Sequence, residues 1–384
     1  MTLAVREFEA KGFRSLRSIA YPMSDLDVFV GANGVGKTNL YRAFELLKAA
    51  AANTLAHDLV RQGGLASAMW AGPRRKDQKA RLYLAVSLSA EPKGEAGRYR
   101  YEVEIGFPPT EASAAFEGEP QIKAERIAFI GRSRTTRLVD RKNHSVMARA
   151  ADGRPTQIDI DLLDSETVLG RLEDPSTYPE LDAIRRTLLQ WRFYHGLRTD
   201  EASPIRQPCP AVATPTLASD GSNLAAVFAT LAHIRQDVAD LDAAIDHAFP
   251  GAQLIIPPPG SFASFGMVFP ELPGRVFEAH ELSDGTLRFL TLAGALLAYR
   301  TPPFLALNEP EASLHPDLME PLARLIVRAS RHTQVWLVTH STRLADAISA
   351  TGAGQVRTVR KTDGATTIDG LKMWGEFAEE EVEA

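Results

Sequence analysis

The sequence predicts an α/β fold, and three observations lead to this prediction. Residues 26–30 are a short apolar run, LDVFV, followed by the glycine-rich GANGVGKTN of residues 31–39 and then by a helical apolar periodicity. From residue 281 onward, helical patterns alternate with short apolar strands, as in a parallel sheet covered by helices. Between these regions, residues 79–150 alternate with period two, which is typical of antiparallel strands. We therefore expect an α/β domain that a β-rich segment interrupts.

The glycine-rich segment has the pattern of a phosphate-binding P-loop, G-x-x-x-x-G-K-[ST]. Its glycines let successive backbone N–H groups face an anion, and the following helix adds the partial positive charge of its N-terminus. Lys37 should reach the β- and γ-phosphates of ATP, and the Thr38 hydroxyl should ligate Mg²⁺. A glycine-rich turn can match this pattern by chance, but the strand before it and the helix after it favour a P-loop NTPase. The residues expected to bind the nucleotide are Asn33, Gly34, Gly36, Lys37, Thr38 and Asn39.

The predicted domain consists of a P-loop half, residues 1–52, and a second half, residues 191–372. The β-rich subdomain of residues 79–150 is inserted between these halves, and residues 373–384 form an acidic tail. There is no long run of heptads, so no long coiled coil is expected. A helical segment is expected instead, with helices at 179–190, from about 223, and at 239–248.

Composition excludes several classes of protein. The chain has 384 residues, a net charge of −5 and one cysteine, Cys209, so neither a disulfide framework nor a multi-cysteine zinc site can form within it. No apolar run approaches the roughly 20 residues of a membrane span, and the first residues lack the apolar stretch of a signal peptide. We therefore expect a cytoplasmic protein with no membrane partner.

A second strand end carries candidate catalytic residues. Residues 304–309, FLALNE, form an apolar strand that ends in polar residues, which is the shape of a Walker B strand. Asn308 would occupy the metal-organising position, and Glu309 would lie beside the γ-phosphate. Asparagine keeps a carbonyl acceptor but lacks the charge of the usual acidic residue, so we expect weaker binding of Mg²⁺–ATP and slow hydrolysis.

Two further segments complete the candidate site. Ser283 and Gly285, in ELSDGT, open a helix: the serine can cap it, and the glycine lets its backbone approach a ligand closely. His340 follows the strand of residues 335–339, at the edge of the sheet where α/β sites gather. Taken singly, these residues also fit an ordinary helix cap and a core or loop histidine, but their joint order favours an ATPase.

Together the segments GANGVGKT, ELSDGT, ALNEPEASLHP and LVTHS resemble the ABC-type ATPases of the SMC and RecF group. The strongest likeness is to the stand-alone RecF-like ATPases of bacteria, which are OLD- or AAA-type heads without a nuclease domain. It covers residues 1–50 and 190–360 well and the β-rich segment only loosely. Relatives of the OLD nuclease type carry a C-terminal Toprim domain, for which too few residues follow His340.

The resemblance implies a role for each matching residue. It implies that Glu309 is the general base and that His340 is the switch histidine that senses the γ-phosphate. Ser283 and Gly285 would bind the γ-phosphate of ATP held by the opposite subunit, so the resemblance implies an ATP-dependent homodimer. Ser313 and Leu314 match the D-loop at the dimer interface, and a structural role is expected for the neighbouring His315. Gln62 and Gln190 are both weak candidates for a Q-loop glutamine.

The sequence leaves two kinds of target open. Residues 121–150 hold eight Lys and Arg against two acidic residues, a local charge of +6 that could follow the phosphates of double-stranded DNA. A solvated hairpin surface or a docking face for an acidic partner would look the same. The first hypothesis is therefore a RecF-like ATPase in DNA repair or genome maintenance. The alternative is the regulatory ATPase subunit of an anti-phage defence or toxin system, whose partner carries the effector activity.

Overall fold

The structure is a computed structural model, and it divides the chain into two compact units. The first unit comprises Met1–Ser24, Gly31–Trp191 and Arg357–Ala384, and the second comprises Asp25–Val30 and Arg192–Val356. The described residues are 3–73, 79–90, 97–109, 116–235, 238–372 and 375–377. Most of the predicted acidic tail, residues 373–384, therefore lies outside the described residues.

The first unit contains an eight-stranded antiparallel sheet of order β2-β1-β4-β5-β6-β7-β8-β9. Val5, Phe8 and Ala10 of β1 lie opposite apolar residues of β4, so both strands present one continuous apolar face. The predicted β-rich subdomain, residues 79–150, is thus not separate from the N-terminal strands, because β4 pairs with β1. The strands are β1 (Ala4–Phe13), β2 (Leu16–Pro22), β4 (Leu82–Ser89), β5 (Arg98–Gly106), β6 (Gln121–Ile130), β7 (Thr135–Lys142), β8 (Ser145–Arg149) and β9 (Pro155–Gln157).

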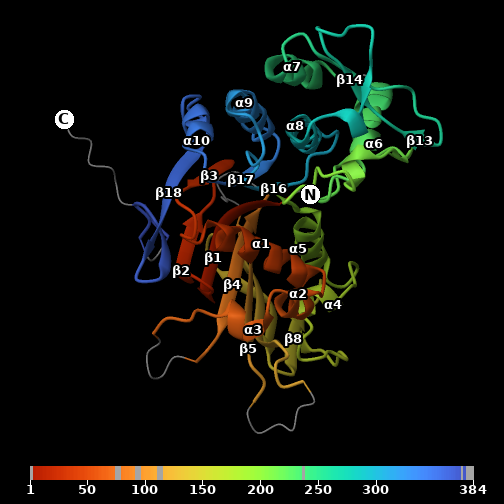
Figure 1. The fold of residues 1–384 in the computed structure, drawn as a ribbon. Helices are drawn as coiled ribbons and strands as arrows, with labels where there is room; N and C mark the ends of the chain where they lie inside the picture. Colours follow the sequence, from red (N-terminus) through yellow and green to blue (C-terminus); the bar gives the residue numbers. More distant parts are fainter. Residues whose placement is uncertain are drawn as a thin grey trace. The chain divides into compact units, whose positions relative to one another are not determined.

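Helix α1 (Lys37–Ala51) packs on the apolar face of this sheet (Figure 1). The predicted stripe, which includes Leu40, Phe44 and Leu47, is buried, and the Phe44 ring stacks on Phe8 of β1 with centroids 4.2 Å apart. The shorter helices of the unit are α2 (Leu55–Arg61), α3 (Gly64–Ala68), α4 (Val168–Arg171) and α5 (Pro179–Gln190). Near the C-terminus, β18 (Gln355–Thr362) and β19 (Ala365–Ile368) pair as an antiparallel hairpin.

The second unit contains a parallel sheet of order β10-β16-β17-β3. Its strands are β10 (Arg192–His195), β16 (Phe304–Asn308), β17 (Gln334–Thr339) and β3 (Leu26–Val30). Helices α8 (Asp284–Leu296), α9 (Met319–Ala329) and α10 (Thr342–Ser349) lie side by side over these strands (Figure 1). The sequence-based prediction of a parallel sheet covered by helices is confirmed. β10 lies beside β16 at the edge of this sheet, a pairing that the sequence did not predict.

The remaining elements of the second unit are short. Helix α6 (Leu224–Ala229) continues into a π-helical turn, Thr230–Arg235, and α7 (Ala239–Ala248) follows. The small strands are β11 (Cys209–Pro210), β12 (Gln253–Ile255), β13 (Phe262–Ala263), β14 (Gly266–Val268) and β15 (Phe277–Glu278). The longest described helix, α1, has 15 residues, so the described parts of the chain contain no long coiled coil, as expected.

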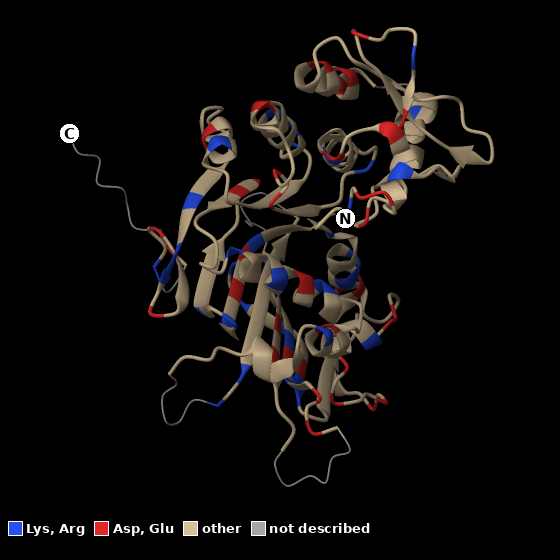
Figure 2. Ribbon diagram, viewed as in Figure 1, with Lys and Arg blue, Asp and Glu red and all other residues tan. Residues whose placement is uncertain are grey.

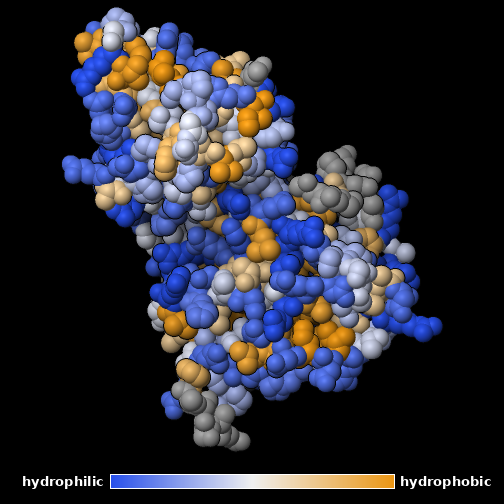
Figure 3. Space-filling view, turned by 90° about the vertical axis from the view of Figure 1, so that its right-hand side faces the viewer, coloured by the Kyte–Doolittle hydropathy of each residue, from blue (hydrophilic) through white to orange (hydrophobic). Residues whose placement is uncertain are grey.

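Among the described helices, none combines the length and the apolar character that crossing a bilayer requires. The face drawn in Figure 3 is mainly hydrophilic, with apolar side chains in small groups.

Candidate nucleotide site

The P-loop lies in the first unit, between the end of β3 and the start of α1. Lys37 is the first residue of α1, and its Nζ donates hydrogen bonds to the carbonyl oxygens of Gly31, at 2.6 Å, and Ala32, at 2.8 Å. Gly34 and Gly36 have φ angles of 79° and 99°, which side chains rarely adopt. The loop therefore has the left-handed turns and the helix N-terminus that a phosphate cradle requires.

Two residues that the sequence analysis did not identify support this loop. The Thr366 hydroxyl of β19 donates to the Val35 carbonyl at 2.8 Å, and the Asn39 amide donates to Ser15 Oγ at 2.7 Å. The hydroxyls of Ser15 and Thr366 are 2.6 Å apart. Because the proton of Thr366 is used on Val35, Ser15 donates to Thr366. Asn39, expected to bind the nucleotide, thus also anchors the loop to the N-terminal strands.

In the second unit, the carboxyl ends of neighbouring parallel strands bring the other candidate residues together. Asn308 ends β16 and is paired with His195, the last residue of β10. Thr339 ends β17 and is paired with Val30 of β3, after which the chain continues into Gly31. Glu309 and His340 are the residues directly after β16 and β17. These residues occupy the sheet edge at which α/β proteins bind their ligands.

The two predicted catalytic residues, Glu309 and His340, are neighbours, and a second glutamate, Glu311, connects the turns that carry them. His340 Nδ1 lies 3.8 Å from Glu309 Oε1 and 3.5 Å from Glu311 Oε1. The buried Glu311 accepts hydrogen bonds from Thr339 Oγ1 at 2.6 Å and from the backbone N–H groups of His340 at 3.0 Å and Ser341 at 3.2 Å. Glu311 thereby connects the turn after β16 to the turn after β17. The sequence did not predict this contact.

The signature segment lies beside the D-loop. Ser283 caps α8, since its Oγ accepts a hydrogen bond from the Thr286 N–H at 3.2 Å. A Cβ atom on Gly285 would come within 3.2 Å of the Ser313 carbonyl oxygen. Ser313 has a φ of 65° and Glu309 a φ of 49°, so the segment after β16 contains two non-glycine residues in the left-handed region. Such conformations persist only where surrounding contacts hold them.

Arg288 supplies contacts that hold this segment. From α8, its buried guanidinium donates to the carbonyl oxygens of Glu309 at 3.1 Å, Pro310 at 3.2 Å and Leu197 at 3.0 Å. Burial lowers the pKa of Arg288, and the carboxylates of Glu311 and Glu309 oppose that shift. The helix that begins with the signature segment is thus bonded to the backbone of the predicted general base. No sequence motif identified Arg288.

We expect Arg288→Met to lower the free energy of unfolding by about 3 kcal/mol, because it leaves buried carbonyl oxygens without a donor. Arg324→Met is the matched control: Arg324 pairs with Glu320 on the surface, and such pairs contribute at most about 1 kcal/mol. Denaturant titration of both variants measures the difference. Equal losses would show that the Arg288 contacts do not hold the segment.

Asn308 presents one oxygen that fits a metal site. Its amide is buried, and Nδ2 donates to His195 Nδ1 at 2.7 Å, whereas Oδ1 has no hydrogen-bond partner among the described residues. Glu311 Oε2 is likewise buried without a partner there. Unused buried acceptors suit the water shell of Mg²⁺, which is usually bound by one or two side chains plus substrate phosphates. The described residues contain no cluster of three or more His, Cys, Asp or Glu side chains that could hold a metal ion.

Gln62, Gln190 and His315 occupy structural positions. Gln62 Oε1 accepts a hydrogen bond from Arg14 Nη2 at 3.1 Å, and Gln190 ends α5, so both stay weak candidates for a Q-loop glutamine. His315 caps the turn of Pro316–Leu318, its Nδ1 accepting from the Asp317 N–H at 3.3 Å.

The charge of residues 121–150 is balanced by acidic residues of neighbouring strands. Arg126 lies near Glu102 of β5 and near Asp140, and Arg137 bonds to Asp140 at 2.7 Å. Arg141 is fully buried and bonds to backbone carbonyls. Figure 2 shows acidic and basic residues interleaved on this sheet. The local charge of +6 counted along the sequence therefore does not form a continuous basic surface, although Arg132 and Arg134 are exposed in the turn between β6 and β7.

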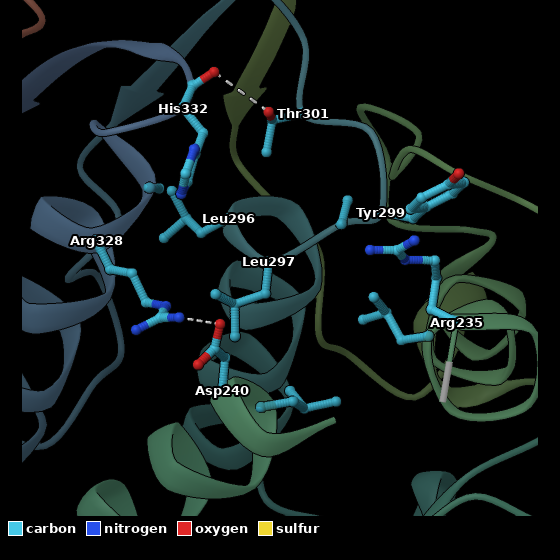
Figure 4. Close-up of a pocket in the computed structure, with 12 residues that line it drawn as sticks. Arg235, Asp240, Leu296, Leu297, Tyr299, Thr301, Arg328 and His332 are labelled. Atoms are coloured by element: carbon cyan, nitrogen blue, oxygen red, sulfur yellow. Dashed lines mark hydrogen bonds and ion pairs between the residues drawn. The ribbon is translucent and has the colours of Figure 1, made fainter. Parts of the chain in front are cut away.

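Figure 4 shows a cavity of about 400 Å³ in the second unit, with Arg235, Tyr299 and Arg328 among the residues that line it. The Arg235 guanidinium lies over the Tyr299 ring, 4.7 Å from its centroid, and Arg328 forms an ion pair with Asp240. None of the predicted nucleotide or catalytic residues lines this cavity.

The fold and these residues define a P-loop protein of the ABC-ATPase type. A family model described as "AAA domain, putative AbiEii toxin, Type IV TA system" matches residues 165–346, slightly less than half of the chain. The search of curated proteins found no match.

Two solved structures with this fold are SMC head domains. One is an SMC head bound to the C-terminal winged-helix domain of ScpA: 18% identity, a TM-score of 0.52, and coverage of 95% of this chain and 97% of that one. The other is an SMC head with an extended coiled coil, bound to the C-terminal domain of ScpA, from Pyrococcus furiosus: 16% identity, a TM-score of 0.51, and 96% coverage of both chains. The chain thus has the head fold of the SMC and RecF group of ABC-type ATPases, as its motifs predicted.

Proposed function

We propose that this protein binds and slowly hydrolyses ATP and that ATP drives its dimerisation. The observation that supports this most is the joined arrangement of Glu309, Glu311 and His340 at the ends of two parallel strands. A general base needs a fixed position beside the attacking water, and Glu311 and Arg288 fix the turns that carry Glu309 and His340. The exposed fraction of the Glu309 side chain is 37%, so its carboxylate remains accessible to water.

Each residue has a distinct role in this proposal. Lys37 and the backbone N–H groups of the P-loop bind the phosphates, and Thr38 and Asn308 would hold Mg²⁺, which offsets the charge that develops on the phosphates. Glu309 accepts a proton from the attacking water, and His340 contacts the γ-phosphate and reports its loss. Ser283 and Gly285 bind the γ-phosphate held by a second copy of the chain.

The contact between Gly285 and Ser313 supports the dimer. In the group that this chain resembles, the signature segment and the D-loop both act across the dimer interface. Here these two segments lie close together within one chain, and Arg288, a residue of the signature helix, donates hydrogen bonds to the carbonyl oxygens of Glu309 and Pro310. Binding of a second copy of the chain at Ser283 would therefore affect the segment that carries the general base, Glu309.

Of the two roles left open, we favour that of the regulatory ATPase subunit of a defence or toxin system over that of a DNA-repair ATPase. The description of the matching family model names a toxin–antitoxin system. In addition, most arginines of residues 121–150 already form ion pairs or hydrogen bonds within the protein. The partner protein would then carry the effector activity. DNA repair remains the second candidate, and it rests on the exposed arginines of the β6–β7 turn.

Duplex binding distinguishes these candidates. If Arg132 and Arg134 alone contact phosphates, the logarithm of the binding constant should fall with a slope of only about −2 against the logarithm of salt concentration. Changing Arg132, Arg134 and Arg137 to Glu should then alter an already weak affinity without changing ATP hydrolysis. A fluorescence anisotropy titration across salt concentrations is the measurement. A slope of about −6 or steeper, together with loss of duplex binding in the triple variant, would instead establish DNA as the target.

A further inference from the structure

The Walker B strand of this chain ends in an amide where an acidic residue is expected, and a histidine lies next to it. Asn308 is 3% exposed, and His195 is its registered partner on the adjacent parallel strand β10. Asn308 Nδ2 and His195 Nδ1 are 2.7 Å apart. The two residues are separated by 113 positions in the sequence, so only the strand order brings them together.

The chemistry of the two groups fixes the direction of this hydrogen bond. An amide nitrogen carries two hydrogens and no available lone pair, so Asn308 donates and His195 Nδ1 accepts. The proton of the neutral imidazole is therefore on Nε2. With Nδ2 held by His195, Oδ1 must point to the other side of the amide, where it is buried and accepts no hydrogen bond from the described residues.

This orientation matters for a cation. An amide can turn by 180° and present either its oxygen or its N–H₂ group to the same point, and the N–H₂ group would repel Mg²⁺. A carboxylate has no such ambiguity, because both of its oxygen atoms are acceptors. An asparagine at the Walker B position therefore needs a neighbour that selects one orientation.

We propose that His195 is a positioning residue that holds the Asn308 amide with Oδ1 toward the Mg²⁺ of the bound nucleotide. This inference rests on the proposed function, since it assumes a Mg²⁺–ATP site at Asn308. It explains how a chain without the usual acidic residue keeps a usable metal-organising group. Partners of metal-site groups that act in this way commonly change metal affinity by about 10- to 100-fold when removed.

The test is direct metal binding by the full chain, with Mn²⁺ as the probe in the presence of a non-hydrolysable ATP analogue. We expect His195→Ala to weaken Mn²⁺ binding, followed by electron paramagnetic resonance, by about 10-fold, and to leave the affinity for the analogue without metal unchanged. His332→Ala, which alters an exposed histidine of the same unit, is the control and should bind Mn²⁺ as the parent does.

Asn308→Asp supplies the second arm. This variant should bind Mn²⁺ more tightly than the parent, need less Mg²⁺ and hydrolyse ATP faster, because a charge returns to the site. In the Asn308→Asp background, His195→Ala should change Mn²⁺ affinity by less than about twofold, since either carboxylate oxygen can face the metal. That double variant also shows that removal of His195 leaves the fold intact.

Two outcomes would contradict the positioning role of His195, and a third would contradict the proposed function. Unchanged Mn²⁺ affinity in His195→Ala would contradict the positioning role, and so would an equal loss in both backgrounds, which would assign His195 an effect unrelated to amide orientation. A parent protein that binds neither the analogue nor Mn²⁺ would overturn the proposed function itself.

Discussion

Glu309→Gln protein is expected to accumulate as a dimer when ATP and Mg²⁺ are added. Glutamine keeps the size and hydrogen-bonding capacity of Glu309 but cannot take a proton from water, so hydrolysis should fall by about 10²- to 10⁴-fold while ATP still binds. The turn that carries the residue is held through backbone atoms by Arg288, and these contacts do not depend on the side chain of residue 309. Light scattering after size exclusion measures the mass with and without nucleotide.

Glu271→Gln is the control, because Glu271 is an exposed glutamate of the same unit outside the site. It should hydrolyse ATP at the parent rate and return to the monomer as ATP is consumed. If Glu309→Gln protein binds ATP but stays monomeric at micromolar concentration, ATP does not drive dimerisation.

Gly36→Ala should weaken nucleotide binding strongly. Gly36 has a φ of 99°, and a Cβ atom there would overlap the side-chain oxygens of Thr366 and Ser15. The loop can accommodate a methyl group only by moving away from the hydroxyl groups that support it. We expect ATP affinity to fall on the order of 100-fold, because this movement costs roughly 3 kcal/mol of charge-assisted phosphate contacts.

Gly64→Ala is the matched control for this change. Gly64 in α3 has a φ of 81°, and a Cβ atom there would meet nothing within 4 Å. It should therefore cost only about 1 kcal/mol of backbone strain and leave ATP affinity unchanged. Calorimetric titration with ATP compares the two variants. A Gly36→Ala protein with parental affinity would show that the Ser15 and Thr366 support is not needed.

The parts of the site that were predictable from the sequence are local. The P-loop needs Gly31, Gly36 and Lys37 at fixed short spacings, and the buried stripe of α1 needs apolar residues at helical intervals, so both patterns are visible without a structure. The same holds for the apolar strand that ends at Asn308.

The parts that were not predictable depend on partners distant in sequence. Thr366 lies 351 positions from Ser15, and periodicity does not say which strands become neighbours. The pairing of β1 with β4 joined the predicted subdomain to the N-terminal strands for the same reason. Counting charges along residues 121–150 likewise missed Glu102, which lies opposite Arg126 on β5.

The measurement that tests the central claim most directly is mixing of two inactive variants. Lys37→Ala removes the phosphate-binding lysine, and Ser283→Arg blocks the signature segment. If each ATP site combines the P-loop of one copy with the signature segment of the other, a mixed dimer has one intact site. An equimolar mixture should then regain about a quarter of the parent ATPase activity, since half of the dimers are mixed and each has one of two sites. A mixture as inactive as its components, with both variants folded, would contradict the shared site.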